Sequence, residues 1–292
     1  MINYVLVSDS TLDLPEKYCN KQNIHIVPMP FIVNGQTYKH YIDTREMSYK
    51  EFYLKLEKGE SASTSQINYK QFYEYFEDIL KLGKDIIYIS FSAEMSGTYN
   101  TSKIAVTDLL EKYPNRKITV IDSKCASVGE GLLAYNASLR MDKGYGYNEL
   151  CNWIVNNRSN ICHWFVVDDL EQLKRGGRIS PLTATIGKML QIKPLLTVNN
   201  KGGLETVSKI RGSSKVFDTL VSKFINDKKS AVTSTVVVGH ANCYENAVTL
   251  KKMLMDTKQV KKVIISDIGP VIGSHVGSGM LAVTFTGTRK LK

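Results

Sequence analysis

The sequence predicts an α/β protein of two domains, with a mainly parallel sheet in residues 1–160 and an α+β layered domain in residues 161–292. In the first part, short runs of Val, Ile and aromatic residues alternate with helix-like segments, which is typical of parallel strands joined by helices. The second part contains two strands about a glycine turn, which indicates antiparallel pairing. No repeat, linker or low-complexity tract separates the parts, so we expect the domains to pack closely.

Three predicted strands in the first part each precede a helix-like segment. They cover residues 2–7, 86–91 and 118–121. Ser48 and Glu51 have the spacing of a capping box ahead of one helix. Asn68 and Gln71 resemble that box ahead of the next helix. An Asn-Gly pair at 34–35, inside a run of strand-forming residues, predicts a tight hairpin turn.

The second part predicts a hairpin followed by alternating helices and strands. The hairpin covers 195–207, and its turn contains Gly202 and Gly203. The elements after it are a helix over 213–225, a strand over 235–239, a helix over 245–255 and a strand over 263–268. This mixture favours an α+β layer rather than a purely parallel sheet.

Composition places the chain among globular proteins. It has 292 residues, 43% of them hydrophobic, which is enough to fill large cores. Its five cysteines include no C-x-x-C pair and its five histidines no H-x-x-x-H pair, so neither a redox motif nor a metal site is predicted. The start lacks the pattern of a signal peptide, and no run of 18 apolar residues is present. We therefore expect a cytoplasmic protein with reduced thiols.

Basic residues are concentrated in the second half of the chain. Residues 1–160 contain 18 Lys and Arg against 19 Asp and Glu, whereas residues 161–292 contain 20 against 9. This asymmetry indicates a face that meets an acidic partner, which could be a protein, a phosphorylated ligand, a membrane surface or nucleic acid. Ordinary solvated lysines are the alternative.

Three segments rich in glycine or hydroxyl groups suit a small anionic head group. They are Thr64-Ser65-Gln66, Ser96-Gly97-Thr98-Tyr99 and the run over 269–279. Each is expected to offer backbone N–H groups and hydroxyls without a bulky side chain in the way. Ser96 also lies between a predicted strand and helix, where helix N–H groups point outward. A helix cap at Ser96 and a plain loop at Thr64 are the structural alternatives.

Two further turns are explained by helix capping, and one of them also carries a cation. Asp13, followed by Pro15, is expected to cap a short helix after the first strand. Gly176 and Gly177 follow a helix-like segment and predict a helix C-cap and a turn. Arg178 is the cation placed between these glycines and a predicted new helix.

Patterns of common enzymes give little support to catalysis. The sequence has no P-loop and no G-x-S-x-G elbow. A serine–histidine pair of Ser96 and His275 stays open, which would make the chain a stand-alone α/β hydrolase or acyl transferase. The sequence contains no helix-turn-helix and no aromatic ladder of the kind that binds nucleic acid, so no nucleic-acid partner is expected.

Five motifs together resemble the bacterial DegV family, in order and over nearly the whole chain. They are Asp9-Ser10-Thr11-x-Asp13-Leu14-Pro15, Thr64-Ser65-Gln66, Ser96-Gly97-Thr98-Tyr99, Gly176-Gly177-Arg178-Ile179-Ser180 and Gly269-Pro270-Val271-Ile272-Gly273-Ser274-His275-Val276-Gly277. The resemblance implies a two-domain DegV-like fold that encloses a long-chain fatty acid between its domains. It also implies a non-enzymatic, lipid-binding subunit of a fatty acid kinase, acting in phospholipid metabolism without a cofactor. The kinase itself is then a separate protein, and transient contact with a membrane surface stays open.

The resemblance also assigns roles to single residues. Thr64 and Ser96 match the positions whose hydroxyls hold the fatty acid carboxylate. The possible neighbours of the head group are Ser65, Gly97, Thr98, Arg178 and His275. From the charge asymmetry we expect Lys209 and Arg211 to dock the kinase. The chain departs from the family pattern at Ile67-Asn68, where a proline usually follows the glutamine, and at Ser278, where proline is common. These changes affect loop stiffness more than hydrogen-bond donors.

Overall fold

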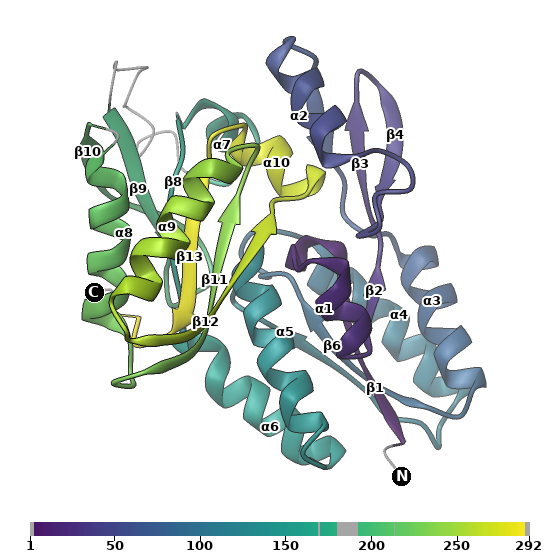
Figure 1. Cartoon of the computed structure of the whole chain (residues 1–292). Helices are drawn as coiled ribbons and strands as arrows, with labels where there is room; N and C mark the ends of the chain where they lie inside the picture. Colours follow the sequence, from purple (N-terminus) through teal and green to yellow (C-terminus); the bar gives the residue numbers. More distant parts are fainter. Residues whose placement is uncertain (1–2, 169, 180–191, 213, 290–292) are drawn as a thin grey trace.

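A computed structural model describes residues 3–168, 170–179, 192–212 and 214–289, which form three sheets (Figure 1). The first sheet is parallel, in the order β2-β1-β6-β7. Its strands are β1 (Tyr4–Asp9), β2 (Ile24–Val27), β6 (Asp85–Ser90) and β7 (Ile118–Asp122). The short helices η1 (Ser10–Leu12) and α1 (Glu16–Lys21) connect β1 to β2. The predicted strands of the first part are therefore confirmed.

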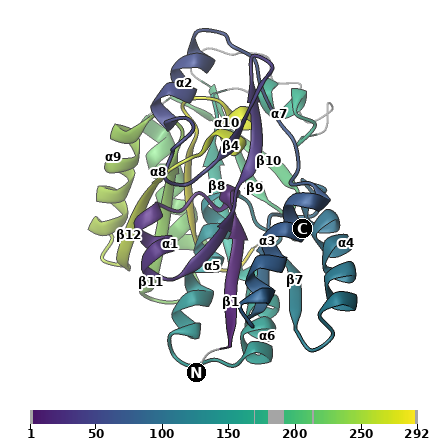
Figure 2. The same ribbon diagram turned by 90° about the vertical axis from the view of Figure 1, so that its right-hand side faces the viewer.

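Helices cover both faces of the parallel sheet. On one face lie α3 (Tyr69–Lys81) and α4 (Thr98–Lys112), and on the other α5 (Val128–Met141) and α6 (Tyr147–Asn157) (Figures 1 and 2). The predicted capping box at Asn68 begins α3, since the side chains of Asn68 and Gln71 each bond the other's backbone N–H. Strands buried on both faces explain why β1 and β6 are nearly continuous apolar runs.

The second sheet has six strands, in the order β10-β9-β8-β13-β11-β12. They are β8 (Ile161–Val166), β9 (Ile192–Val198), β10 (Leu204–Arg211), β11 (Thr233–His240), β12 (Val260–Asp267) and β13 (Leu281–Thr286). Only the β11–β12 pair is parallel among these described strands. Helices α8 (Ser214–Asp227) and α9 (Tyr244–Asp256) cover its outer face (Figure 2). The mixed α+β layer predicted for the second part is confirmed.

Helix α5 joins the two sheets into one core. It contacts β1 and β6 of the first sheet, and β8, β11 and β13 of the second. A helix that is apolar around most of its circumference belongs inside a protein, and 11 of the 14 residues of α5 are buried. The strands of the two sheets lie on either side of residue 160, but the domain boundary itself stays a prediction.

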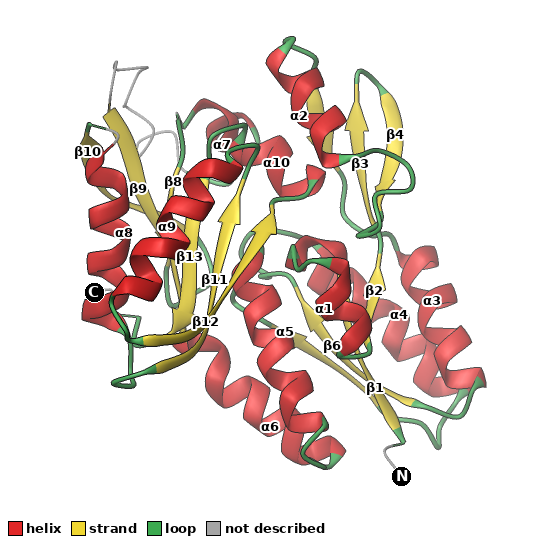
Figure 3. Cartoon of the chain, in the orientation of Figure 1, coloured by secondary structure: helices red, strands yellow, loops and turns green. Residues whose placement is uncertain are grey.

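A small third sheet projects beside the first. Its strands are β3 (Met29–Val33), β4 (Gln36–His40) and β5 (Ala62–Thr64), with α2 (Tyr49–Glu57) between β4 and β5. The predicted hairpin turn is confirmed, because Asn34 and Gly35 both have positive φ, as a type I′ turn requires. Helix α10 (Pro270–Val276) packs against α2, β3, β5 and α7 (Glu171–Arg175), where the layers meet (Figure 3).

The prediction that Asp13 caps the helix after it is wrong, although Asp13 ends the short helix η1. Pro15 is the N-cap of α1, and Asp13 has a left-handed backbone with a φ of 46°. Its carboxyl instead accepts hydrogen bonds from the Ser127 hydroxyl at 2.5 Å and from the Gly269 N–H at 2.9 Å. Asp13 therefore ties the loop after β1 to the starts of α5 and α10.

The structure tests the turn predicted at Gly176 and Gly177, but not the helix predicted after it. Gly176 is the C-cap of α7 and Gly177 has a φ of 70°, which confirms the predicted turn. Ser180 and the helix expected after it lie outside the described residues. Within the described residues, no helix combines the length and the apolar character needed to cross a membrane.

Candidate functional site

An apolar cavity lies between the two larger sheets. It holds about 970 Å³ of space free of protein atoms, part of it open to solvent. Its apolar lining residues are Met29, Phe91, Met95, Ala126, Val128, Trp164, Phe165, Leu173, Val198, Leu204, Val271, Ile272, Val276, Met280 and Ala282. Much of the lining comes from α5 and α10, from the ends of β5 and β6, and from β8, β9, β10 and β13.

Polar groups gather at one end of this cavity, which we call the mouth. They are Thr64, Ser65, Gln66, Ser96, Gly97, Arg178 and His275. Ser65, Gln66 and Gly97 are exposed, whereas Thr64 and His275 are half-buried. The mouth is therefore the end of the cavity that faces solvent.

Thr64 and His275 form the contact that closes the mouth between β5 and α10. Thr64 Oγ1 lies 2.9 Å from His275 Nε2. The other ring nitrogen, Nδ1, is buried and has no hydrogen-bond partner among the described residues. With the imidazole proton on Nε2, His275 donates to Thr64 and leaves the Thr64 hydroxyl proton free for a ligand.

Burial keeps the imidazole of His275 neutral. Burial, and then the nearby Arg178 guanidinium, lower the pKa of His275 from 6.5 to about 4. A Cβ at Gly176 would lie 2.3 Å from His275 Nδ1, so glycine is required for α7 to pack this closely on the ring. The Nε of Arg178 donates to the Met95 carbonyl at 3.1 Å, which holds the guanidinium at the mouth.

Ser96 and Gly97 lie at the start of α4, on the opposite side of the mouth. Ser96 Oγ accepts from the Thr98 N–H at 3.3 Å and lies 2.9 Å from Thr98 Oγ1. Gln66 donates to Thr101 Oγ1 at 3.0 Å and so joins the loop after β5 to the same helix. The hydroxyl of Ser96 thus has a capping contact and also lines the cavity.

The opposite end of the cavity, which we call the floor, consists of Thr11, Ser127, His163 and Thr284. All four are buried. His163 and Thr284 face each other across the β8–β13 ladder, with the Phe165–Ala282 pair next toward the mouth. The chain passes from the end of β8 to Leu173 and Arg178, so the floor and the mouth lie toward opposite ends of β8.

Three buried carboxyl groups lie behind the floor. Asp9 accepts from Thr11, Tyr88 and the Phe91 N–H, and Glu130 accepts from Ser8 at 2.8 Å. Burial raises the pKa of Asp13 from 3.8 to about 8, and raises those of Asp9 and Glu130 as well. Each carboxyl has hydroxyl or backbone donors, and no described residue forms an ion pair with any of them.

The structure brings most of the predicted site residues together. Thr64, Ser65, Ser96, Gly97, Arg178 and His275 all line the mouth. Thr98 is buried behind Ser96 and is not among the described lining residues. Lys209 and Arg211 are exposed on β10, away from the cavity lining, although Leu204 at the start of the same strand lines it.

The glycine-rich run over 269–279 differs from its prediction as a source of free N–H groups. The N–H of Gly269 donates to Asp13, and those of Gly273, Gly277 and Gly279 donate to backbone carbonyls. The run folds into α10 and contributes apolar side chains and His275 to the cavity instead. The prediction is wrong at these four glycines, because Gly273 and Gly277 donate within the helical turns of α10, while Gly269 and Gly279 donate to Asp13 and Ala241.

The floor residues were not predicted. Thr11 follows β1 at the carboxyl edge of the parallel sheet, where ligands gather, so its position was a usable signal. His163 and Thr284 are single polar residues inside apolar strands. Nothing in the local sequence distinguishes them from other buried polar residues.

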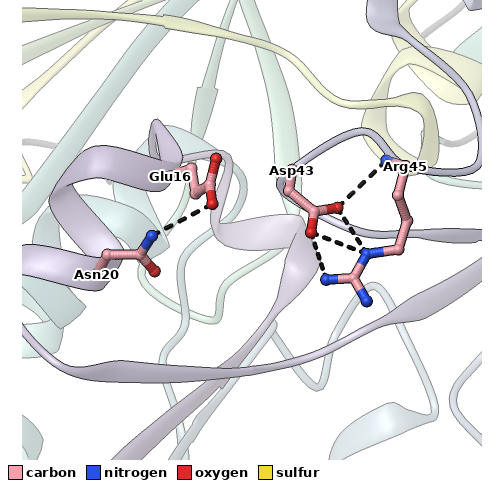
Figure 4. A network of polar contacts seen from close by, with 4 residues as sticks. All are labelled: Glu16, Asn20, Asp43 and Arg45. Carbon is pink, nitrogen blue, oxygen red and sulfur yellow. Dashed lines mark hydrogen bonds and ion pairs between the residues drawn. The ribbon is translucent and has the colours of Figure 1, made fainter.

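A second cavity, with about 900 Å³ free of protein atoms, lies beside α1 and is mainly polar. Figure 4 shows four of its residues, with Arg45 Nε donating to Asp43 at 2.8 and 2.9 Å and Asn20 donating to Glu16 at 3.2 Å. The Arg45 and Asp43 side chains are 64% and 29% exposed, so solvent screens their attraction. The enclosed apolar cavity is therefore the candidate site.

Comparisons with known proteins identify the family of this chain. A model of the DegV family, described as an uncharacterised protein family, matches residues 3–288. A DegV domain-containing protein of Clostridium perfringens is 40% identical over 99% of both chains, and one of Lactococcus lactis is 32% identical over 99% of both.

Solved structures share the whole fold. DegV of Bacillus subtilis, described as a fatty acid binding protein, superposes with a TM-score of 0.85 at 27% identity, over 99% of this chain and 100% of that one. A fatty acid binding DegV family protein of Streptococcus agalactiae gives 0.83 at 26%, with the same coverage. A DegV family protein of Thermus thermophilus gives 0.87 at 24%, over 98% and 100%, which shows the fold alone. By sequence and by fold, this chain belongs to the DegV family.

Proposed function

We propose that this protein binds a long-chain fatty acid in the cavity between its sheets, with the carboxylate at the mouth and the tail along the apolar lining. The observation that carries the proposal is one enclosed apolar cavity with hydroxyls and a guanidinium at its solvent-facing end. The fatty acid binding described for the Bacillus subtilis and Streptococcus agalactiae proteins supports it. In this proposal residues 1–160 and 161–292 act as two domains that hold the ligand between them.

Thr64 and Ser96 have the positions to receive the carboxylate. Both hydroxyls line the mouth from opposite sides, one at the end of β5 and one before α4. Arg178 adds a positive charge, and neutral His275 fixes the Thr64 hydroxyl. A carboxylate has acceptors only, so it suits this set of donors.

The tail and the head group have different tasks in this arrangement. Each buried CH₂ contributes about 0.8 kcal/mol, so a sixteen-carbon tail gives on the order of 10 kcal/mol before the cost of association. A hydrogen bond to a charged group adds only about 1.5–3 kcal/mol. The tail therefore sets affinity, and Thr64 and Ser96 mainly set orientation.

Orientation matters if the bound carboxylate is presented to a separate fatty acid kinase, which is the finer part of our proposal. Phosphoryl transfer depends on positioning and electrostatics, both of which a fixed carboxylate at a solvent-facing mouth provides. Lys209 and Arg211 form the proposed docking face. They are exposed on β10, an edge strand whose first residue, Leu204, reaches the cavity.

The hydrolase alternative has less support. A serine nucleophile needs a base within hydrogen-bond reach, but the described contacts of His275 Nε2 are with Thr64 and those of Ser96 Oγ are with Thr98. We therefore propose a binding subunit rather than a stand-alone enzyme.

Mass spectrometry tests the binding proposal directly. Native and denaturing spectra of the purified protein should differ by the mass of one fatty acid. Delipidated protein should then take up hexadecanoic or octadecenoic acid at one molecule per chain. Failure to take up either acid would overturn the proposed function, and turnover of an ester by delipidated protein would favour the hydrolase.

A further inference from the structure

The hydroxyl groups of the floor donate away from the cavity. Thr11 donates to Asp9, and Ser127 donates to Asp13 at 2.5 Å. Thr284 Oγ1 lies 3.4 and 3.3 Å from the backbone carbonyls of Val128 and Val237, which only accept. Because each hydroxyl has one proton and it is already used, what remains for a ligand at the floor is lone pairs.

His163 adds no free donor to the floor either. Its Nδ1 lies 3.0 Å from the carbonyl oxygen of Ile161, so Nδ1 carries the ring proton. The Nε2 atom is then an acceptor, and it receives the Ala126 N–H at 3.4 Å. Burial, and then the charge of Arg289, hold the pKa of His163 well below its usual value, so the ring does not gain a second donor near neutral pH.

The surroundings of the carboxyls behind the floor also disfavour a buried negative charge. Asp9 and Asp13 receive the floor hydroxyls, and Glu130 lies 3.2 Å from Thr11 Oγ1. No described residue forms an ion pair with these three groups, and their surroundings are buried. None of the four floor residues carries a positive charge, since three offer hydroxyls and His163 is neutral, so a further carboxylate there would be a buried charge without an ion-pair partner.

The mouth has the opposite polarity. The guanidinium of Arg178 has donors and no acceptor, and the Thr64 hydroxyl is free to donate when His275 donates to it. The two polar ends of one cavity therefore differ: the mouth offers donors and positive charge, whereas the floor offers acceptors backed by carboxyls.

From this difference we infer that the floor is a specificity element, which rejects a second carboxylate at the far end of the acyl chain and accepts a hydroxyl there. The inference rests on the proposed function, because it takes the first carboxylate to lie at the mouth. The ligand class it names is monocarboxylic acids, including chains with a terminal hydroxyl, and not α,ω-dicarboxylic acids. A hydroxyl at the far end donates to the floor acceptors, whereas a carboxylate has no proton to donate.

Three probes of equal chain length test the inference on delipidated protein at neutral pH. They are hexadecanoic acid, the same acid with a hydroxyl on its terminal carbon, and hexadecanedioic acid. We expect the hydroxy acid to bind within about threefold of hexadecanoic acid, and the diacid at least tenfold more weakly. An ordinary apolar pocket would reject the hydroxyl as well, because its proton would lose its partner on burial.

Two variants assign the effect to the floor. Thr284→Val removes an acceptor and should lower the affinity ratio of hydroxy acid to hexadecanoic acid about fivefold. Thr235→Val is the matched control, because Thr235 is buried in the same sheet but is not among the described lining residues. In Asp13→Asn the side-chain amide can donate to Ser127 Oγ, which frees the Ser127 proton for a ligand and should weaken the rejection of the diacid several-fold.

The outcomes separate this inference from the proposed function. Tight binding of hexadecanoic acid with equal binding of the diacid would overturn the inference alone. So would rejection of the hydroxy acid, or a change in the ratio with Thr235→Val as large as with Thr284→Val. Absence of binding by all three acids would overturn the proposed function and the inference with it.

Discussion

The mouth and the floor are both polar ends of the same cavity, yet they are built differently. The mouth residues come from separate elements, joined for example by the contact of Thr64 with His275, and several of them are exposed. The floor residues are only 1–5% exposed and bond to buried carboxyls or backbone carbonyls. The polar side chains of the mouth thus keep donors free, whereas the floor hydroxyls have used theirs within the fold.

Between the two ends, the apolar wall should have the largest effect on affinity. Ala282 lies between Thr284 and Met280 on the cavity face of β13. In Ala282→Phe the ring would displace roughly three or four methylene groups of the tail, so affinity for hexadecanoic acid should fall on the order of 100-fold. Ala282→Val should give a smaller loss. Titration calorimetry measures both, and unchanged affinity in Ala282→Phe would place the tail elsewhere.

Substitutions at the mouth should affect fatty acid affinity less than they affect phosphorylation of the bound acid by the kinase. Thr64→Val and Ser96→Ala each remove one hydrogen bond to the carboxylate, and water at the solvent-facing mouth can replace part of it, so affinity should fall only about two- to tenfold. Phosphorylation by a cognate kinase should fall further, about 100-fold, because the carboxylate is misplaced by about 1 Å.

Thr107→Val is the matched control for the mouth variants, since Thr107 is exposed on α4 and bonds only the Lys103 carbonyl among described contacts. Assays of acyl-phosphate formation and of binding, run side by side, decide the outcome. Equal, small effects on both would mean that Thr64 and Ser96 serve the fold alone.

The carboxyls behind the floor predict an alkaline loss of stability. Burial raises the pKa of Asp13 from 3.8 to about 8, so between these values the folded protein holds a proton that the unfolded chain has lost. The free energy of unfolding should therefore fall as pH rises from about 4 to 8. Asp13→Asn should flatten this slope in urea titrations, and an unchanged slope would mean that Asp13 does not hold the proton.

His275 at the mouth predicts the opposite dependence of stability on pH. The pKa of His275 is lowered from 6.5 to about 4, so between these values the unfolded chain binds a proton that the folded protein does not. Its contribution to stability should be lost as pH falls from 6.5 to 4. His275→Gln should reduce this acid sensitivity, and the same urea titrations would show no change if the ring were protonated in the fold.

The smallest effect on binding is expected outside the cavity. Reversing the charges of Lys209 and Arg211 to Glu should leave hexadecanoic acid uptake unchanged, because neither side chain lines the cavity among described residues. Acyl-phosphate formation should slow, and added kinase should restore part of the rate. Loss of uptake in a fluorescence displacement assay would instead make these residues part of the pocket wall.

Local sequence patterns predicted much of this fold. Capping residues such as Asn68, the Asn34-Gly35 turn and the apolar runs of β1 and β6 specify their own elements, and the structure has them there. Asp13 was misassigned because its partners, Ser127 and Gly269, are more than 110 residues away in the chain.

The mouth was easier to predict than the floor for the same reason. Thr64, Ser96 and His275 lie in runs of small and hydroxyl residues that are unusual in themselves. His163 and Thr284 meet only through the pairing of β8 with β13, and Thr11 joins them only because α5 brings the sheets together. The floor therefore depends on tertiary contacts between segments that are far apart in the sequence.

The orientation of the ligand is the central claim, and nuclear magnetic resonance of hexadecanoic acid with a carbon-13 label at its carboxyl tests it most directly. The bound carboxyl should give one resonance that moves in Thr64→Val and in Ser96→Ala but keeps its position in Thr284→Val, because the carboxylate lies at the mouth. A resonance that moves in Thr284→Val and not in the two mouth variants would place the head group at the floor and contradict the account.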